Sequence, residues 1–161
     1  MSQTQLEKDE QYMRRALELA AEAGSRGEIP VGAVVVEETP EGSRIVAEDA
    51  NFKELSGDPL GHAEVLAIRK ASEELGRWRL SGCTLYVTLE PCTMCAGAII
   101  HSRVDRVVFA ATDPKAGAVH SLYQILNDPR LNHAPEVLAG VLQPEASEQL
   151  KSFFRALRKK P

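Results

Sequence analysis

The 161-residue sequence has no long apolar segment, because polar residues interrupt every hydrophobic stretch well before the about 20 residues that a membrane-spanning helix needs. Its first residues, Met1–Glu7, have neither a basic start nor an apolar core, so we expect no secretory signal and a cytoplasmic location. No repeat, linker or low-complexity tract divides the chain. With 43% apolar and 26% charged residues, it is typical of a globular protein, and we expect a single domain over residues 1–161.

Cysteine is scarce, and its few positions limit the possible chemistry. The chain contains Cys83, Cys92 and Cys95 only. An odd number in a chain without a secretory signal is not typical of a disulfide framework. Cys92 and Cys95 form a C-x-x-C pair, which in such a protein indicates either metal binding or redox chemistry.

Positive charge is in deficit, with 19 basic against 23 acidic residues and a formal net charge of −4. This balance by itself argues against a nucleic-acid partner. The charge is divided, however, because Lys151–Pro161 carries five basic and no acidic side chains, which leaves −9 for residues 1–150. A basic segment on an acidic body is compatible with a local, salt-sensitive contact to nucleic acid.

Hydrophobic periodicity predicts strands that alternate with helices. We expect helices over residues 8–23, 62–76, 92–101 and 121–126 and from Pro144 onward. We expect strands over residues 31–36, 44–47, 84–89, 106–111 and 137–142, with a loop over 48–61. This order favours an α/β sandwich with some parallel pairing and a hairpin at one edge.

Two short motifs contain the residues that are able to bind a metal or take part in catalysis, and each lies where a predicted loop meets a predicted helix. They are His62-Ala63-Glu64 and Pro91-Cys92-Thr93-Met94-Cys95. Helix N-termini favour thiolates, and residues three apart share a helix face, so Cys92 and Cys95 are placed to bind one metal ion. His62 would complete a set of one nitrogen and two sulfurs, which suits Zn²⁺ and leaves a fourth position for water. Glu64 is close enough to share the proton of that water without being a ligand.

Each motif residue also has an alternative role. A C-x-x-C pair alone is equally typical of a redox centre, but that interpretation has no use for the H-x-E motif. Cys83 is expected to be a small buried residue before a strand, and the alternative is a fourth ligand that would close the metal site. Glu90 is an alternative proton carrier to Glu64, although its position beside Pro91 favours a strand-end or capping carboxylate.

Together the motifs match the H-x-E and P-C-x-x-C signature of zinc deaminases. Nearly the whole chain resembles the bacterial tRNA-specific adenosine deaminases, the TadA family of the zinc-dependent cytidine/deoxycytidylate deaminase superfamily. The segments that carry the resemblance are Ile29–Val34, Asn51, Asp58-Pro59, Thr88–Arg103, Val107–Phe109, Asp113, Lys115, Gly117, Ala118 and Phe153–Arg155.

The resemblance implies a three-layer α/β/α cytidine-deaminase-like fold with a central mixed sheet of about five strands flanked by helices. It implies a hydrolase acting on a cyclic amidine C–N bond, which converts the wobble adenosine of an arginine tRNA anticodon to inosine. One zinc ion per subunit would turn water into the attacking hydroxide, and Glu64 would carry the proton to the ring nitrogen and the leaving ammonia. The implied partners are a tRNA anticodon stem-loop and a second subunit in a cytoplasmic homodimer, with no membrane.

The resemblance also implies roles for particular residues. His62, Cys92 and Cys95 are the implied zinc ligands, and Glu64 is the implied proton shuttle. The implied RNA contacts are Asn51 on the flipped base and Asp113, Lys115, Phe154 and Arg155 on the anticodon loop. The chain departs from the family pattern at Ala110, Thr112 and His120, which flank these contacts.

Two other functions remain compatible with the residues. One is a zinc deaminase of a free nucleobase or nucleoside, such as guanine or cytosine, because the zinc motifs do not distinguish it from an RNA deaminase. The other is a non-catalytic zinc module that binds RNA, although such a site has no use for a carboxylate at Glu64.

Overall fold

The computed structural model describes residues 3–159, in which strands and helices alternate as the sequence predicts. Its elements are α1 (Gln5–Ser25), β1 (Gly32–Thr39), β2 (Gly42–Ala50), α2 (Ala63–Leu75), β3 (Cys83–Leu89), α3 (Thr93–Ser102), β4 (Arg106–Ala111), the 3-10 helix η1 (Ile125–Asn127), β5 (Glu136–Ala139) and α4 (Gln143–Arg158). Four residues of the two terminal segments discussed above lie outside the described residues, namely Met1, Ser2, Lys160 and Pro161. None of the helices within residues 3–159 is both long and apolar enough to cross a membrane.

Three predictions about these elements were wrong, and each has a structural reason. Residues 48–50 belong to β2 and not to the following loop, because they pair with β1. The expected helix over 121–126 is replaced by η1, because Ser121 gives its N–H and its hydroxyl to Glu90. Strand β5 ends at Ala139, because Gly140 and Leu142 have positive φ angles of 94° and 57° and turn the chain into α4.

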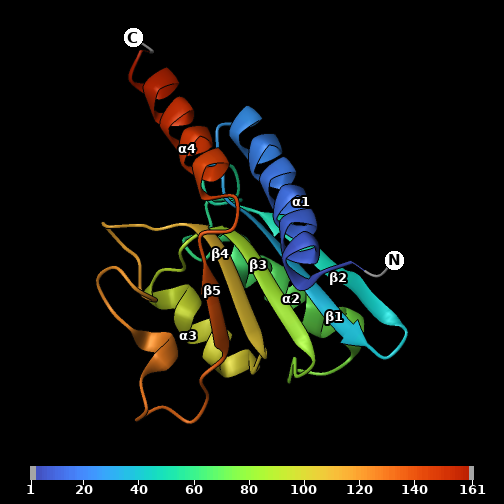
Figure 1. Ribbon diagram of the computed structural model, residues 1–161. Coiled ribbons are helices and arrows are strands. Elements are labelled where there is room, and N and C mark those ends of the chain that lie inside the picture. The colour runs from blue at the N-terminus through green and yellow to red at the C-terminus, as the bar shows by residue number, and fades with distance from the viewer. Residues whose placement is uncertain (1–2, 160–161) are drawn as a thin grey trace.

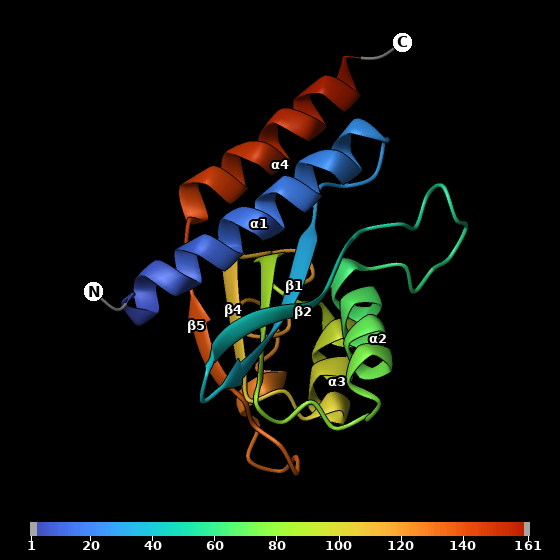
Figure 2. The ribbon, with the colours of Figure 1, turned by 90° about the vertical axis from the view of Figure 1, so that its right-hand side faces the viewer.

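The five strands form one mixed sheet in the order β2-β1-β3-β4-β5. β1 pairs antiparallel with β2 and β3, whereas β4 pairs parallel with β3 and β5. Helices α1 and α4 cover one face, and α2 and α3 cover the other (Figure 1). The turned view separates these layers (Figure 2). The middle strands β3 and β4 are buried on both faces, which accounts for their nearly continuous apolar sequences. The expected three-layer α/β/α fold is confirmed.

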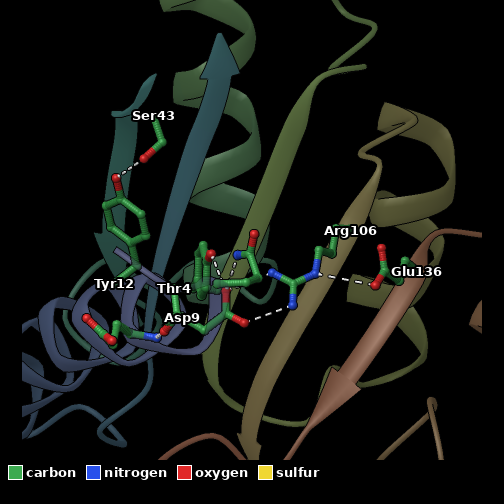
Figure 3. Close-up of polar contacts among 9 residues, drawn as sticks. Thr4, Asp9, Tyr12, Ser43, Arg106 and Glu136 are labelled. Atoms are coloured by element: carbon green, nitrogen blue, oxygen red, sulfur yellow. Dashed lines mark hydrogen bonds and ion pairs between the residues drawn. The ribbon is translucent and has the colours of Figure 1, made fainter. Parts of the chain in front are cut away.

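Helix α1 lies directly on the sheet and is tied to it by a buried carboxylate. Asp9 is 1% exposed and accepts hydrogen bonds from Arg106 of β4, at 2.7 and 2.8 Å, and from the Tyr86 hydroxyl of β3, at 2.8 Å (Figure 3). The same view shows Tyr12 of α1 bonded to Ser43 of β2 (Figure 3). A single helix is therefore bonded to three strands.

The topology gathers four chain segments at one edge of the sheet. Because β1 and β3 are antiparallel, Ala33 pairs with Val87, and the start of β1 lies beside the end of β3. Because β3 and β4 are parallel, Leu89 pairs with Ala111, and their two ends lie together. β2 ends at Ala50, opposite the start of β1. The segments before β1 and after β2, β3 and β4 meet at this edge, and both sequence motifs lie there.

Candidate metal centre and active site

The residues of the two motifs converge across the starts of α2 and α3. His62 is the N-cap residue of α2, Cys92 is the N-cap residue of α3, and Cys95 follows in the first turn. The Nδ1 atom of His62 lies 3.6 Å from Sγ of Cys92 and 3.5 Å from Sγ of Cys95. Ligand bonds of about 2.1 Å to nitrogen and 2.3 Å to sulfur place two tetrahedral zinc ligands about 3.6 Å apart. The spacing therefore fits one tetrahedral zinc ion.

The electrostatics of the two thiols favour a cation between them. Hydrogen bonds from Cys95 and His62 lower the pKa of Cys92 to about 3, so this residue is a thiolate at neutral pH. The hydrogen bond to Cys92 and burial raise the pKa of the Cys95 thiol, because a second negative charge here has no compensation from the protein alone. A divalent cation supplies that compensation, and a bound metal deprotonates its thiol ligands.

Glu64 lies in the first turn of α2 and lines a cavity of about 250 Å³ together with His62 and Cys92. Its side chain is 4% exposed, and burial raises the pKa of Glu64 to about 7. A carboxyl group with a pKa near neutrality is suited to accept and then release a proton. Within the described residues, the group that could hold a metal contains His62, Cys92 and Cys95, without Glu64.

Asn51 and Asp113 line the same cavity from two loops. Asn51, directly after β2, accepts a 2.9 Å hydrogen bond from the Ala63 N–H through Oδ1, which fixes the start of α2. Its Nδ2 donors remain on the amide for a ligand. Asp113, after β4, accepts from the N–H groups of Lys115 and Ala116 and so closes a turn in the loop over 112–121. These predicted contact residues therefore also shape the cavity walls.

The other predicted contact residues lie in an open groove of about 500 Å³ beside α4. Lys115 comes from the loop after β4, and Phe154 and Arg155 come from α4. Lys151 and Arg158 add two further cations to this groove. Phe154 is exposed, whereas the neighbouring Phe153 is half-buried, as expected for adjacent residues on one helix. The basic C-terminal segment thus adjoins the loop that carries Asp113.

The structure decides between the alternatives at Cys83 and Glu90. Cys83 begins β3, and the seven-residue strand separates it from the metal cluster by about 20 Å, so it is not a fourth ligand. The Glu90 side chain is 2% exposed and accepts five hydrogen bonds from the loop over 112–121. Burial alone would raise the pKa of Glu90, but the bonds from Ser121 and from backbone N–H groups lower it to about 2. Glu90 is a capping carboxylate rather than a proton carrier.

Sequence reasoning missed Glu28, which also lines the cavity. This carboxylate is 1% exposed and accepts hydrogen bonds from three consecutive backbone N–H groups, those of Lys53, Glu54 and Leu55. Burial tends to raise the pKa of Glu28, but these three bonds outweigh it and lower the pKa. A glutamate between a helix and a strand has no local pattern that identifies such a role. His120, where we expect a departure from the family pattern, has its ring centroid 5.6 Å from that of Phe109.

The fold and this site define a class of protein. Residues 6–111 match the family model for the cytidine and deoxycytidylate deaminase zinc-binding region. The match covers most of the chain and includes the His-Cys-Cys cluster described above. The class is therefore that of the zinc-dependent deaminases.

The similar proteins narrow this class. The tRNA-specific adenosine deaminase of Bacillus subtilis (strain 168) is 49% identical over 152 residues, which is 94% of this chain and 92% of that protein. A structure from a study of A-to-I editing by tRNA:A34 deaminases has a TM-score of 0.81 at 44% identity, covering 86% of this chain and 98% of the other. A guanine deaminase from Nitrosomonas europaea has a TM-score of 0.73 at 27% identity, covering 89% and 83%. This chain belongs to the family of tRNA-specific adenosine deaminases.

Proposed function

We propose that this chain hydrolyses adenosine to inosine at the wobble position of a tRNA anticodon. Water adds its oxygen to the C6 carbon of adenine, the C6–N6 bond breaks, and ammonia leaves. The family membership supports the reaction, and the tRNA-specific relatives at 49% identity support the substrate. By the same resemblance, the substrate tRNA is an arginine tRNA.

One observation favours RNA over a free base. The loop over 112–121 lines the cavity with Asp113 and Ala116, and the same loop extends Lys115 into the cationic groove beside α4. A base in the cavity can therefore remain attached to a backbone whose phosphates lie along the groove. Cations position a phosphate backbone, and an exposed aromatic ring such as that of Phe154 offers a surface for a stacked base.

His62, Cys92 and Cys95 are the residues that would hold the zinc ion. When bound, the ion supplies Lewis acidity that lowers the pKa of water toward neutrality. Glu64 takes one proton of the attacking water and passes it to N1 of the ring, then takes the second proton from the added hydroxyl and gives it to the departing N6 amino group. Asn51 offers its amide donors to the purine edge, while its oxygen keeps the start of α2 in place.

We also propose a cytoplasmic homodimer. An open groove of about 600 Å³ between α2 and α3 supports a second subunit on that face, because Trp78 lies there with 62% of its surface exposed. Sedimentation of the wild type should give twice the chain mass, and Trp78→Glu should give a monomer. A monomeric wild type would contradict the dimer without affecting the proposed reaction.

The likeness to a guanine deaminase makes a free base the second candidate substrate. The purified protein loaded with zinc should be incubated with an arginine anticodon stem-loop, and separately with guanine, cytosine and adenosine. We expect inosine at the wobble position and no ammonia from the free compounds. Efficient ammonia release from a free base, with an unchanged stem-loop, would reject the RNA substrate and support the second candidate.

A further inference from the structure

Glu90 joins the metal-binding segment to one wall of the cavity. It lies two residues before Cys92, and its carboxylate accepts hydrogen bonds of 2.8–3.0 Å from the N–H groups of Asp113, Val119, His120 and Ser121. The Ser121 hydroxyl adds a fifth bond at 2.5 Å. A loop of nine residues is thereby closed around one carboxylate, and the loop carries both Asp113 and Lys115.

Glu28 has the same arrangement at another part of the cavity lining. It lies just before β1, and its carboxylate accepts the N–H groups of Lys53 and Glu54 at 2.9 and 3.0 Å through Oε1, and that of Leu55 at 2.8 Å through Oε2. Lys53 and Glu54 line the cavity, as does Glu28 itself. The start of the loop after β2 is thereby attached to the segment that leads into β1.

The two carboxylates share an unusual combination of burial and partners. They are 1% and 2% exposed, yet within residues 3–159 neither forms an ion pair. Burial of a carboxylate is costly unless hydrogen bonds replace its water, and here backbone dipoles replace it almost entirely. Such an anchor also satisfies several buried N–H groups at once, which no apolar residue could do.

We infer that Glu28 and Glu90 are positioning residues that hold the two walls of the substrate cavity at a fixed distance from the metal ligands. Neither carboxylate touches the reacting atoms. Glu90 ties Asp113 and Lys115 to the segment of Cys92, and Glu28 ties Lys53 and Glu54 to the start of β1. A shift of about 1 Å in a positioning group can reduce a rate about 10²-fold. The inference rests on the proposed function for its kinetic part only.

The test compares Glu28→Gln with Glu90→Gln in the zinc-loaded, full-length protein. Glutamine keeps the size of the side chain but replaces one acceptor oxygen by a donor that faces N–H groups. Glu48→Gln is the matched control, because Glu48 is a partly buried carboxylate held by the Arg15 side chain instead of by a loop backbone. The measurements are amide hydrogen exchange by peptide, zinc per chain, and kcat and KM on the anticodon stem-loop.

We expect each variant to accelerate hydrogen exchange in the loop that its own carboxylate holds and to leave the other loop unchanged, which is a crossed pattern. Glu90→Gln should accelerate exchange at residues 113–121 at least tenfold and leave residues 53–55 within twofold of the wild type, and Glu28→Gln should do the reverse. Both variants should keep one zinc per chain, and kcat/KM should fall about 10- to 100-fold. For Glu90→Gln the rise in KM should exceed the fall in kcat, because Lys115 faces the groove rather than the cavity. The Glu48→Gln control should change none of these measurements.

Gly117→Ala provides a second route that leaves Glu90 intact. A Cβ atom at Gly117 would lie 2.4–2.5 Å from the Glu90 carboxyl group, so the carboxylate must move. This variant should reproduce the loosening of residues 113–121 even if Glu90→Gln fails to fold. Gly97→Ala is its control, because a Cβ there meets open space.

Uniform acceleration of exchange in both loops, or a kcat/KM within threefold of the wild type, would overturn the inference. The same holds if Gly117→Ala leaves residues 113–121 unchanged. A wild type that makes no inosine would refute the proposed function instead, and the crossed exchange pattern would then decide the anchoring by itself.

Discussion

The two faces of the sheet differ in how they hold charge. On the α2–α3 face, the metal-binding residues and Glu64 lie together at the starts of two helices, with Glu64 and Cys95 buried and His62 and Cys92 half-buried. On the α1–α4 face, charges come from distant segments, as in the buried Asp9–Arg106 pair and the exposed groove of Lys115 and α4. Loss of one member of a buried charged cluster disables the whole cluster, whereas each solvated charge makes a small and separable contribution to binding or stability. The following experiments test this difference, beginning with the largest expected effect.

Cys92→Ala should abolish metal binding and activity. With one of three ligands removed, the remaining histidine and cysteine are too few for a catalytic zinc site. Metal analysis after dialysis should fall from one zinc per chain to near zero, and inosine formation should fall to background. One tightly held ion per chain in this variant would contradict the ligand set.

Cys83→Ala is the control for that experiment, because Cys83 is also buried but lies at the other end of β3. It should keep one zinc ion and full activity while losing some stability. Removal of the metal from the wild type with a chelator should mimic Cys92→Ala, and zinc alone should restore the activity.

Glu64→Gln should separate metal binding from catalysis on the same face. The amide keeps the size of the side chain but cannot carry a proton, so we expect a fall in kcat of about 10³-fold or more with zinc unchanged. Substantial turnover in this variant would refute the proton-shuttle role. Glu74→Gln, an exposed position on the same helix, should leave both readouts unchanged.

The sequence predicted the α2–α3 face more fully than the α1–α4 face, and the reason is that short motifs mark its residues. The spacing of Cys92 and Cys95 fixes their relative geometry within one helical turn, whereas His62, 30 positions before Cys92, is marked by the H-x-E motif. The anchoring of loops by Glu28 and Glu90 depends on partners 23 to 31 positions away, and nothing in the local pattern indicates it. The same holds for Asp9, whose partner Arg106 lies 97 positions along the chain.

The element predictions show the same division. Long amphipathic helices and short β-branched strands follow from local periodicity. The loop over 112–121 does not, because its backbone donors bond to a carboxylate instead of to a helix or a strand. The expected helix at residues 121–126 was wrong for that reason.

Asp9→Asn tests the buried pair that attaches α1 to the sheet. Removal of one charge leaves Arg106, whose side chain is 14% exposed, with only the longer 3.8 Å contact to the exposed Glu136, and we expect a loss of about 3 kcal/mol in the free energy of unfolding. Chemical denaturation measures this loss. Zinc content and kcat should stay at the wild-type values, because the pair lies on the face opposite the metal ligands. A fall in kcat with stability unchanged would contradict the division between the faces.

The pH dependence of this loss has a definite sign. Burial tends to raise the pKa of Asp9, but bonds from Arg106, Tyr86 and Gln5 outweigh it and lower the pKa below its ordinary value of 3.8. The folded state therefore binds fewer protons than the unfolded state, and the pair stabilises the fold fully above pH 3.8. The difference in unfolding free energy between wild type and Asp9→Asn should shrink as the pH falls below this value. A difference that grows on acidification would contradict the assigned pair.

Arg155→Ala should have the smallest effect, because the Arg155 charge is solvated and already paired with Glu148. The guanidinium lies 2.6 Å from Glu148, and the Arg155 side chain is 52% exposed. We expect KM for the stem-loop to rise about 3- to 10-fold with kcat unchanged, and the salt dependence of binding to weaken by about one unit of slope. Arg44→Ala is the matched control, since Arg44 is 56% exposed, also pairs with a glutamate, and lies on the distant β1–β2 hairpin. Equal salt slopes for the two variants would show that α4 contributes only general charge. A fall in kcat for Arg155→Ala would mean that the groove acts on the chemistry of the opposite face as well as on binding.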